Sequence, residues 1–535
     1  HAAILGEEAL ALVRQEFRLA TEGSDVHRSA RLLLEWLTDS VAGGALAALD
    51  EREIAWEGSA AVHLEDGRVI PYQRAAIDIG NTANRDERLM IDRARARVVE
   101  AELAPLRRER FQREKELIEA MEIAPTFNAT FEVLSGVDLR GLVAECEQFL
   151  RDTQAMWDDV YAETVRSKLR IDPGEATRAD AIHLLRAQEF DAHFPSASME
   201  TSIRRQTTEM GIDPDAAGRI TYDTGEREGK RARAFCAPVR VPDEVYLVLR
   251  PHGGQADYRT LLHELGHSLH FAYTRSDYPF EWRWLGDSSV TEGYAMLFDH
   301  LMHDGGWLAR YTELGRRNAP TFLRTVGFEE LHFLRRYCAK LIYETALYSG
   351  EVGWNALPDV YVDRLTSATT FRYDRADAFV DVDPRFYAAR YLRAWQLQAL
   401  LTETLVERFD EDWWRNPKAG PWIVGALFGE GQRELAAELA ERAAGRALSF
   451  APLVRAMSEH GADVTVHGCT TTDLERVARE AGADGKSAAP VVIPVAASAP
   501  EPAPDSSSRN PSGTTPMSTD RPTTIQLAAS GRPSG

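Results

Sequence analysis

Apolar residues recur at spacings of three and four over most of the first 460 residues, which limits this chain to folds built from packed helices. The pattern extends from the start of the chain to about residue 190, and again from Asp257 to about residue 460. Each such helix has an apolar face that must be buried against another element. The sequence therefore predicts a mainly α-helical protein.

Two segments break the helical pattern. Val62–Leu64 and Arg68–Ile70 flank Asp66-Gly67, a dipeptide that suits a tight hairpin turn. Between about 191 and 255 the periodicity changes, and Glu244–Leu249 is rich in branched and aromatic residues. The sequence predicts a β-hairpin at the first segment and a small β-sheet at the second.

Length and composition divide the chain into three parts. Its 535 residues exceed what one compact core usually organises, so we expect a helical lobe over 1–190 and a second lobe over 191–460. Aromatic residues are absent after Gly461, and the segment from Ser487 onward holds nine of the 25 prolines. Such a composition cannot bury enough apolar surface to offset its ordering entropy. It predicts a disordered, low-complexity tail over 461–535.

Net charge, cysteine content and hydropathy limit which partners and which cellular compartment are expected. A formal net charge of -21 would repel a phosphate backbone, and no basic stripe offsets it locally, so nucleic acid is not expected as a partner. Cys146, Cys236, Cys338 and Cys469 are far apart and form no CxxC pair, which favours a reducing compartment. No run approaches 18 uninterrupted apolar residues, and the N-terminus lacks a leader pattern. We expect a cytoplasmic protein that does not insert into a membrane.

The segment Leu261–His270 contains the pattern HExxH on a stretch with helical periodicity. Residues four apart lie one turn above each other on a helix, so the imidazoles of His263 and His267 can converge on one cation. Glu264 is displaced by about 100° around the axis. That position suits a base that activates a metal-bound water, and the pattern predicts a zinc site.

A catalytic zinc ion needs three protein ligands and one open position, so a third donor must lie elsewhere. The pattern HExxHxxGxxH is absent, because His270 stands at the glycine position and Tyr273 at the third histidine position. Glu292 follows His267 after 24 intervening residues, inside the amphipathic run Val290–Phe298. The sequence predicts one Zn²⁺ ion held by His263, His267 and Glu292.

Other candidate donors fit this centre less well. Glu292 is favoured over Glu281 and Asp287 as the third ligand. His270 lies one turn beyond His267, where a structural role or a contact to a ligand is expected. Four further histidines have no ligand spacing to one another and are interpreted as ordinary helix or loop residues: His252, His300, His303 and His332.

Several segments, in their order along the chain, resemble the thimet oligopeptidase and oligoendopeptidase F family of zinc metallopeptidases, which are gluzincins with HExxH and a downstream glutamate. They cover roughly residues 230 to 400. The first are a strand region (Lys230–Cys236 with Glu244–Leu249), a glycine loop (Gly253-Gly254) and the HExxH helix (Leu261–His270). A glutamate helix (Val290–Phe298) and a tyrosine segment (Asp383–Tyr391) follow. The resemblance implies a two-lobed helical molecule with a deep substrate channel, zinc at its floor, and short unstructured peptides as substrates.

The tyrosine segment both matches the family and departs from it. In the family such tyrosines donate hydrogen bonds to the tetrahedral intermediate, a catalytic role that the resemblance carries to Tyr387 and Tyr391. Arg385 or Val382 stands where the family has a histidine, and Ala394 stands where a further tyrosine is often found. Arg385 could supply the missing positive charge, or it could be a channel-lining or surface arginine.

The expected activity is zinc-dependent hydrolysis of peptide bonds in short oligopeptides. Glu264 would accept the proton of the attacking water and deliver it to the leaving amine. The strand near 244–249 could hold an extended substrate by main-chain pairing, and Gly253-Gly254 could allow close backbone approach or form a simple turn. Two alternatives stay open: a related gluzincin carboxypeptidase, and a helical zinc-binding protein without turnover.

Overall fold

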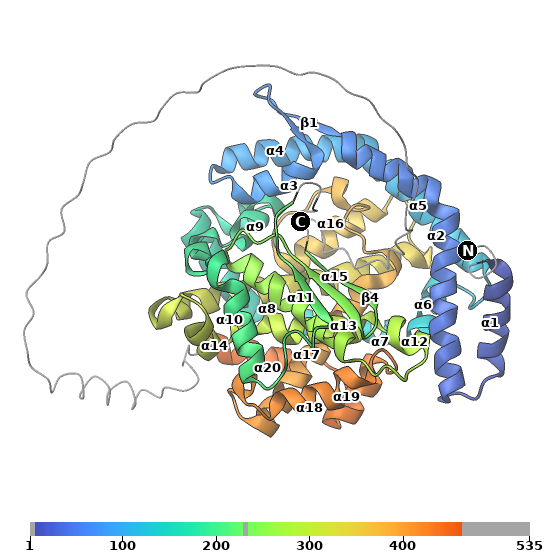
Figure 1. Cartoon of the computed structure of the whole chain (residues 1–535). Coiled ribbons are helices and arrows are strands. Elements are labelled where there is room, and N and C mark those ends of the chain that lie inside the picture. The colour runs from blue at the N-terminus through green and yellow to red at the C-terminus, as the bar shows by residue number, and fades with distance from the viewer. Residues whose placement is uncertain (1–5, 228–229, 231–233, 463–535) are drawn as a thin grey trace, which may run out of the picture. The chain divides into compact units, whose positions relative to one another are not determined.

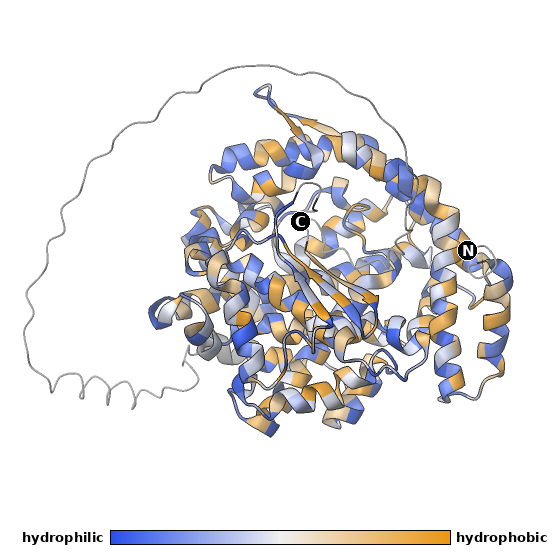
Figure 2. Cartoon of the chain, viewed as in Figure 1, coloured by the Kyte–Doolittle hydropathy of each residue, from blue (hydrophilic) through white to orange (hydrophobic). Residues whose placement is uncertain are grey.

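Helices predominate in the computed structural model of the chain, which describes residues 6–227, 230 and 234–462 (Figure 1). Most helices carry polar and apolar residues on different sides, as expected for helices that bury one face (Figure 2). The prediction of a mainly α-helical protein with small sheets is confirmed. The predicted tail lies, from residue 463 onward, outside the described residues.

The N-terminal part is helical, as its periodicity predicts. Short 3₁₀ and π turns connect several of its helices, whose bounds are α1 (Glu7–Leu19), α2 (Asp25–Ser59), α3 (Tyr72–Asn81), α4 (Arg85–Val98), α5 (Ala104–Ala120), α6 (Phe127–Ser135), α7 (Leu139–Asp152), α8 (Gln154–Thr164) and α9 (Arg178–Leu185). The predicted hairpin is confirmed. Strands β1 (Ala61–His63) and β2 (Val69–Pro71) pair antiparallel around the turn, with Val62 opposite Ile70.

Helix α2 is, within the described part of the chain, the one helix whose length and apolar composition would allow it to cross a membrane. It packs against α1, α5 and α6. Its acidic residues Glu35 and Asp39 form ion pairs with Arg390 and Arg385, which precede or begin the last long helix. These contacts pack one side of α2 against the protein, and 33% of its apolar 18-residue window is buried.

A three-stranded sheet lies beside the helix that carries HExxH. Its strands are β3 (Ile220–Asp223), β4 (Phe235–Arg240) and β5 (Glu244–Val248), in the order β3-β5-β4. The predicted strand at 244–249 is β5, which pairs parallel with β3 and antiparallel with β4. Both edges of β5 are therefore occupied, and the expectation that it could pair with a substrate is wrong. Strand β4 lies at the edge instead and packs against the HExxH helix.

The helices that carry the predicted ligands lie in the second half of the chain. This region comprises α10 (Ser196–Glu209), α11 (Gln255–Tyr273), α12 (Phe280–Trp284), α13 (Ser288–Asp299), the 3₁₀ turn η5 (His300–His303), α14 (Gly305–Tyr311), α15 (Gly315–Ser349), α16 (Leu357–Thr369), α17 (Tyr387–Phe409), α18 (Ala419–Ala426), α19 (Ala436–Ala444) and α20 (Ala451–Ala462). Helix α13 packs along both α11 and α17. It is therefore held on two sides, which favours a rigid placement of the residues it carries.

Two large apolar cores stabilise the described chain. One surrounds α11 and the sheet and includes Leu261, Leu265 and Tyr294. The other joins Trp157 to Tyr337, so side chains on both sides of residue 190 share it. The described residues accordingly fall in one compact unit. The division into lobes at residue 190 stays a prediction.

Candidate metal centre

Helix α11 begins at a glycine turn that follows β5. Gly253 and Gly254 have φ of 89° and 93°, a region open to glycine but strained for other residues. A side chain at Gly254 would also collide with the Asp191 carboxylate, 2.7 Å from the Cβ position. The amide of Gly254 donates to the Phe194 carbonyl at 2.8 Å. Of the two roles considered for these glycines, the structure therefore supports the turn.

The first two predicted ligands lie on one face of α11. The imidazole rings of His263 and His267 have centroids 4.9 Å apart and are nearly perpendicular, at 86°. His263 is buried and His267 is partly buried. This is the geometry expected for histidines four residues apart on a helix.

Helix α13 brings Glu292 to these histidines. The Asp287 side chain caps the helix by accepting from the Ser289 amide at 2.9 Å. Gly266 of α11 faces the α13 backbone so closely that a Cβ atom there would lie 2.6 Å from the Cα of Ala295. The two ligand-bearing helices therefore approach each other at a distance that only glycine allows.

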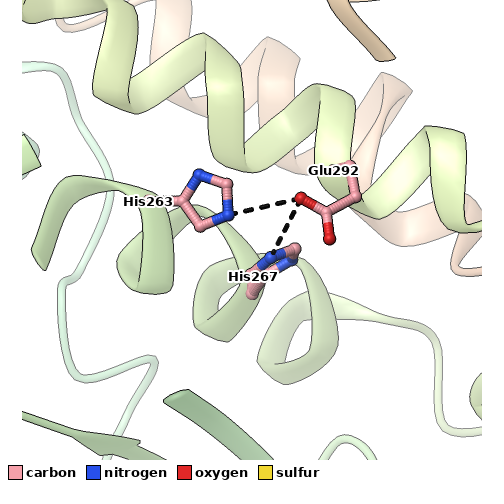
Figure 3. Close-up of side chains that lie close together, drawn as sticks. All are labelled: His263, His267 and Glu292. Carbon is pink, nitrogen blue, oxygen red and sulfur yellow. Dashed lines mark ion pairs between the residues drawn. The ribbon is translucent and has the colours of Figure 1, made fainter. Parts of the chain in front are cut away.

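The three predicted ligands converge (Figure 3). The Nε2 atom of His263 lies 3.3 Å from Oε2 of Glu292, and Nε2 of His267 lies 3.7 Å from the same oxygen. One ligand atom from each residue lies within 4.8 Å of the others. Two imidazole nitrogens and one carboxylate are a donor set that suits Zn²⁺ and related divalent ions. The residues therefore fit the expected metal.

Hydrogen bonds at the Nδ1 atoms orient the rings of His263 and His267. Nδ1 of His263 lies 2.8 Å from Oδ2 of Asp299, and Nδ1 of His267 lies 2.9 Å from the Thr291 hydroxyl. A proton on Nδ1 leaves the Nε2 lone pair free to bind a metal. A carboxylate behind a ligating histidine also fixes the ring and raises its basicity. Asp299 and Thr291 both contact the Nδ1 side of the predicted ligands, and Asp299 supplies the carboxylate.

Burial and neighbouring charges shift the pKa values of the three predicted ligands. Burial lowers the pKa of His263, but the Asp299 and Glu292 carboxylates outweigh burial and raise that pKa to about 10. Burial raises the pKa of Glu292, whereas hydrogen bonding to His263 and the charge of His267 lower it to about 2. The pKa of His267 is lowered, chiefly by burial. The site thus favours positive charge next to Glu292, which a divalent ion would supply in place of the His263 proton.

Glu264, the predicted base, follows His263 on α11 and contacts the neighbouring sheet. Its Oε2 accepts a hydrogen bond of 2.8 Å from the Cys236 amide in β4. Its side chain is partly buried, between α11 and the edge strand. The carboxylate is therefore held next to the strand edge.

The predicted tyrosines lie at the start of α17. The Tyr387 hydroxyl donates to Oε1 of Glu292 at 2.5 Å, so Tyr387 contacts a predicted ligand directly. The ring of Tyr391 packs on Tyr387, with centroids 5.1 Å apart, and stacks on Tyr337. Arg385 pairs with Asp39 and with Glu114. Its ion-pair partners are thus acidic residues of α2 and α5, which favours the lining role over replacement of a catalytic histidine.

Asp287 and Glu281, the alternatives considered for the third ligand, lie outside the cluster of His263, His267 and Glu292. Asp287 caps α13 and also accepts from the Ala436 amide at 3.0 Å. Glu281 lies on α12, outside the cluster of possible ligands. His270 has the structural place expected of it, with Nε2 3.0 Å from the Gly431 carbonyl and Nδ1 3.2 Å from the Thr291 hydroxyl.

Sequence reasoning missed several residues of this region. Asp299 follows Glu292 by seven residues, two helical turns along the same face, and that spacing could have indicated it. The Cys236 amide could not have been found, because its contact with Glu264 depends on how β4 packs against α11. His300 and His303, interpreted as ordinary residues, lie with Glu330 in a second cluster whose possible ligand atoms are within 4.8 Å of one another.

Comparison with solved structures places this arrangement in a helical fold shared with proteins named as peptidases. A Bacillus anthracis protein proposed to be an oligoendopeptidase F matches with a TM-score of 0.61 at 13% identity, over 84% of this chain and 81% of that one. A proposed peptidase from Chlamydophila abortus matches with a TM-score of 0.59 at 13% identity, over 85% and 81% of the two chains.

A further structure, also proposed to be an oligoendopeptidase F, has a TM-score of 0.62 at 14% identity and covers 85% of this chain and 83% of its own. No protein-family profile and no curated protein sequence matches the chain. At these identities the comparisons establish the shared fold, and the chemistry rests on the site itself.

Proposed function

We propose that the chain is a zinc-dependent oligoendopeptidase that hydrolyses peptide bonds in short, unstructured peptides. The observation that carries this proposal is the convergence of His263, His267 and Glu292, with Glu264 held beside them. The fold shared with structures named as oligoendopeptidase F supports the same substrate class.

His263, His267 and Glu292 would hold the ion. When bound, zinc supplies a Lewis acid that lowers the pKa of water towards about 7 and polarises a carbonyl. Glu264 accepts the proton of the attacking water and later donates it to the leaving amine. The Cys236 amide, which donates to Glu264, keeps this carboxylate oriented before substrate binds.

The peptide is proposed to bind along β4. This strand is at the edge of its sheet and its Cys236 amide points to Glu264, so a peptide paired with β4 would pass beside the base. Pairing through main-chain groups tolerates many side chains and requires an extended, unfolded substrate. This accounts for a preference for short unstructured peptides.

Tyr387 is proposed to act at the same centre. In the absence of substrate its hydroxyl donates to Glu292 at 2.5 Å. It can therefore orient that ligand, and it is near enough to the ligand set to donate to the oxyanion of the intermediate. Tyr391, which packs on the Tyr387 ring, is proposed to support it.

The decisive test is Glu264→Gln, with Glu281→Gln as the matched control. General-base catalysis contributes about 10²- to 10⁴-fold, so Glu264→Gln should lower cleavage of an internally quenched peptide by at least about 100-fold while zinc stays bound. Glu281→Gln should leave both unchanged, because Glu281 lies outside the ligand cluster. Elemental analysis measures the zinc and fluorescence measures the cleavage.

Two further outcomes separate the alternatives. Cleavage of peptides blocked at both ends supports the endopeptidase, whereas cleavage only at a free C-terminus would identify a carboxypeptidase. Zinc binding without chelator-sensitive cleavage of any peptide in a mixed library would identify a binding protein. Near-wild-type turnover by Glu264→Gln would show that the base is assigned wrongly.

A further inference from the structure

We propose that His300, His303 and Glu330 form a second divalent-metal site, distinct from the centre at His263, His267 and Glu292. His300 and His303 belong to η5, which follows α13 directly, and Glu330 belongs to α15. One possible ligand atom from each residue lies within 4.8 Å of the others. The donor set, two imidazoles and a carboxylate, is the same as that of the first centre.

The Glu330 carboxylate lies between the two imidazoles. Its Oε1 is 3.0 Å from Nε2 of His300, and its Oε2 is 3.1 Å from Nδ1 of His303. The imidazole centroids are 4.8 Å apart. The three side chains are 9%, 14% and 12% exposed, so the donors are largely desolvated but reachable from solvent.

Asp299 lies between the two clusters, and each of its carboxylate oxygens contacts a histidine of one cluster. Its Oδ2 lies 2.8 Å from Nδ1 of His263, and its Oδ1 lies 2.7 Å from Nδ1 of His300. The Met296 carbonyl is a second acceptor for Nδ1 of His300, at 2.9 Å. An Nδ1–H group of His300 can donate to either acceptor, which leaves Nε2 as the nitrogen that a metal would bind.

The Nε2 atom of His300 is therefore left to face Glu330, just as Nε2 of His263 faces Glu292. A carboxylate behind an imidazole, with a second carboxylate in front of its other nitrogen, is the arrangement found around metal-bound histidines. Here it occurs twice around one aspartate. The repetition, and not the cluster of acidic groups alone, indicates a second metal.

The ligand chemistry selects a borderline divalent ion such as Zn²⁺ or Co²⁺ over Ca²⁺ or Mg²⁺, which prefer oxygen ligands. An ion bound there would connect the end of α13 to α15. Because α13 also carries Glu292, such a cross-link would hold the first centre in place. The proposed role is structural, and it does not depend on peptidase activity.

The test is metal stoichiometry of the folded chain. Zinc-loaded wild-type protein, freed of loose metal, should contain two equivalents by elemental analysis, and the metal-free protein should bind Co²⁺ in two steps by absorption. His303→Asn and Glu330→Gln should each retain one equivalent. His252→Asn, at an exposed histidine, is the matched control and should retain two.

Peptide cleavage separates this proposal from the proposed function. His303→Asn should lose one equivalent while chelator-sensitive cleavage persists, since the first ligand set is intact. If the chain is not a peptidase, the two equivalents should still be found.

A single equivalent in the wild type, unchanged in both variants, would overturn the second site, as would two equivalents that both variants keep. Circular dichroism verifies that each variant is folded. If one variant does not fold, the wild-type Co²⁺ titration and the other variant decide.

Discussion

Replacing Gly266 by alanine tests whether the close contact between α11 and α13 sets the geometry of the centre. A Cβ atom at residue 266 would lie 2.6 Å from the Cα of Ala295, 2.7 Å from the Tyr294 carbonyl oxygen and 3.0 Å from the Ala295 amide nitrogen. All three are backbone atoms, so no side-chain rotation relieves the clash. The helices themselves must move.

The size of that movement follows from the distances. Ordinary contact begins at 3.4 Å, so the two backbones must separate by about 0.8 Å from their 2.6 Å approach. Zinc sites tolerate about 0.2 Å in their ligand distances. Because Glu292 is on α13 and both histidines are on α11, the shift acts directly between ligands. We expect at least a 10-fold loss of zinc affinity, and overpacking should cost about 1–3 kcal/mol of unfolding free energy.

Two other helical glycines supply graded controls. A Cβ at Gly293 of α13 would lie 2.8 Å from Cδ2 of Leu397, a side-chain atom that can move, so Gly293→Ala should be milder. Gly327 of α15 has nothing within 4 Å, and Gly327→Ala should stabilise the protein by up to about 1 kcal/mol through helix propensity.

Zinc affinity is measured by competition with a chromogenic chelator, and stability by urea unfolding of the metal-free protein. From most to least damaging, the order expected in both assays is Gly266→Ala, Gly293→Ala, Gly327→Ala. Wild-type zinc affinity in folded Gly266→Ala would refute the claim that this contact positions the ligands.

Three further predictions concern single side chains. Glu292→Gln should lose stoichiometric zinc while Glu281→Gln keeps it, by elemental analysis, because only Glu292 faces the histidines. Tyr387→Phe should lower kcat by about 10²- to 10³-fold with little change in KM if the hydroxyl serves the oxyanion, whereas a purely orienting role would change only zinc affinity. Asp381→Asn should cost about 3–5 kcal/mol in urea unfolding, because it leaves the buried Arg336 guanidinium without its carboxylate partner. Burial raises the pKa of Asp381, but Arg336 lowers it to about 2 overall. The contribution of the ionised Asp381 to the free energy of unfolding is therefore complete above the unfolded pKa of about 3.9 and is lost as the pH falls through about 2. This part of the acid destabilisation should be absent in Asp381→Asn.

Prediction from sequence succeeded where the signal is local. The hairpin at Asp66-Gly67 and the strand at β5 follow from turn chemistry and β-branched content, and both are present. The bounds of β3 and β4 were not predicted, because these strands are defined by their pairing with β5, which is not a local signal. The open edge was consequently placed on the wrong strand.

The placement of the two predicted ligands on α11 was determined by sequence alone, because four residues of helix bring His263 and His267 to one face whatever surrounds them. Everything that depends on two elements meeting was decided by tertiary structure: the Cys236 amide on Glu264, the Tyr387 hydroxyl on Glu292, and Asp299 between two histidine clusters. Periodicity fixes direction around one helix axis but carries no information on which helices become neighbours. Packing of α13 between α11 and α17 supplies that information.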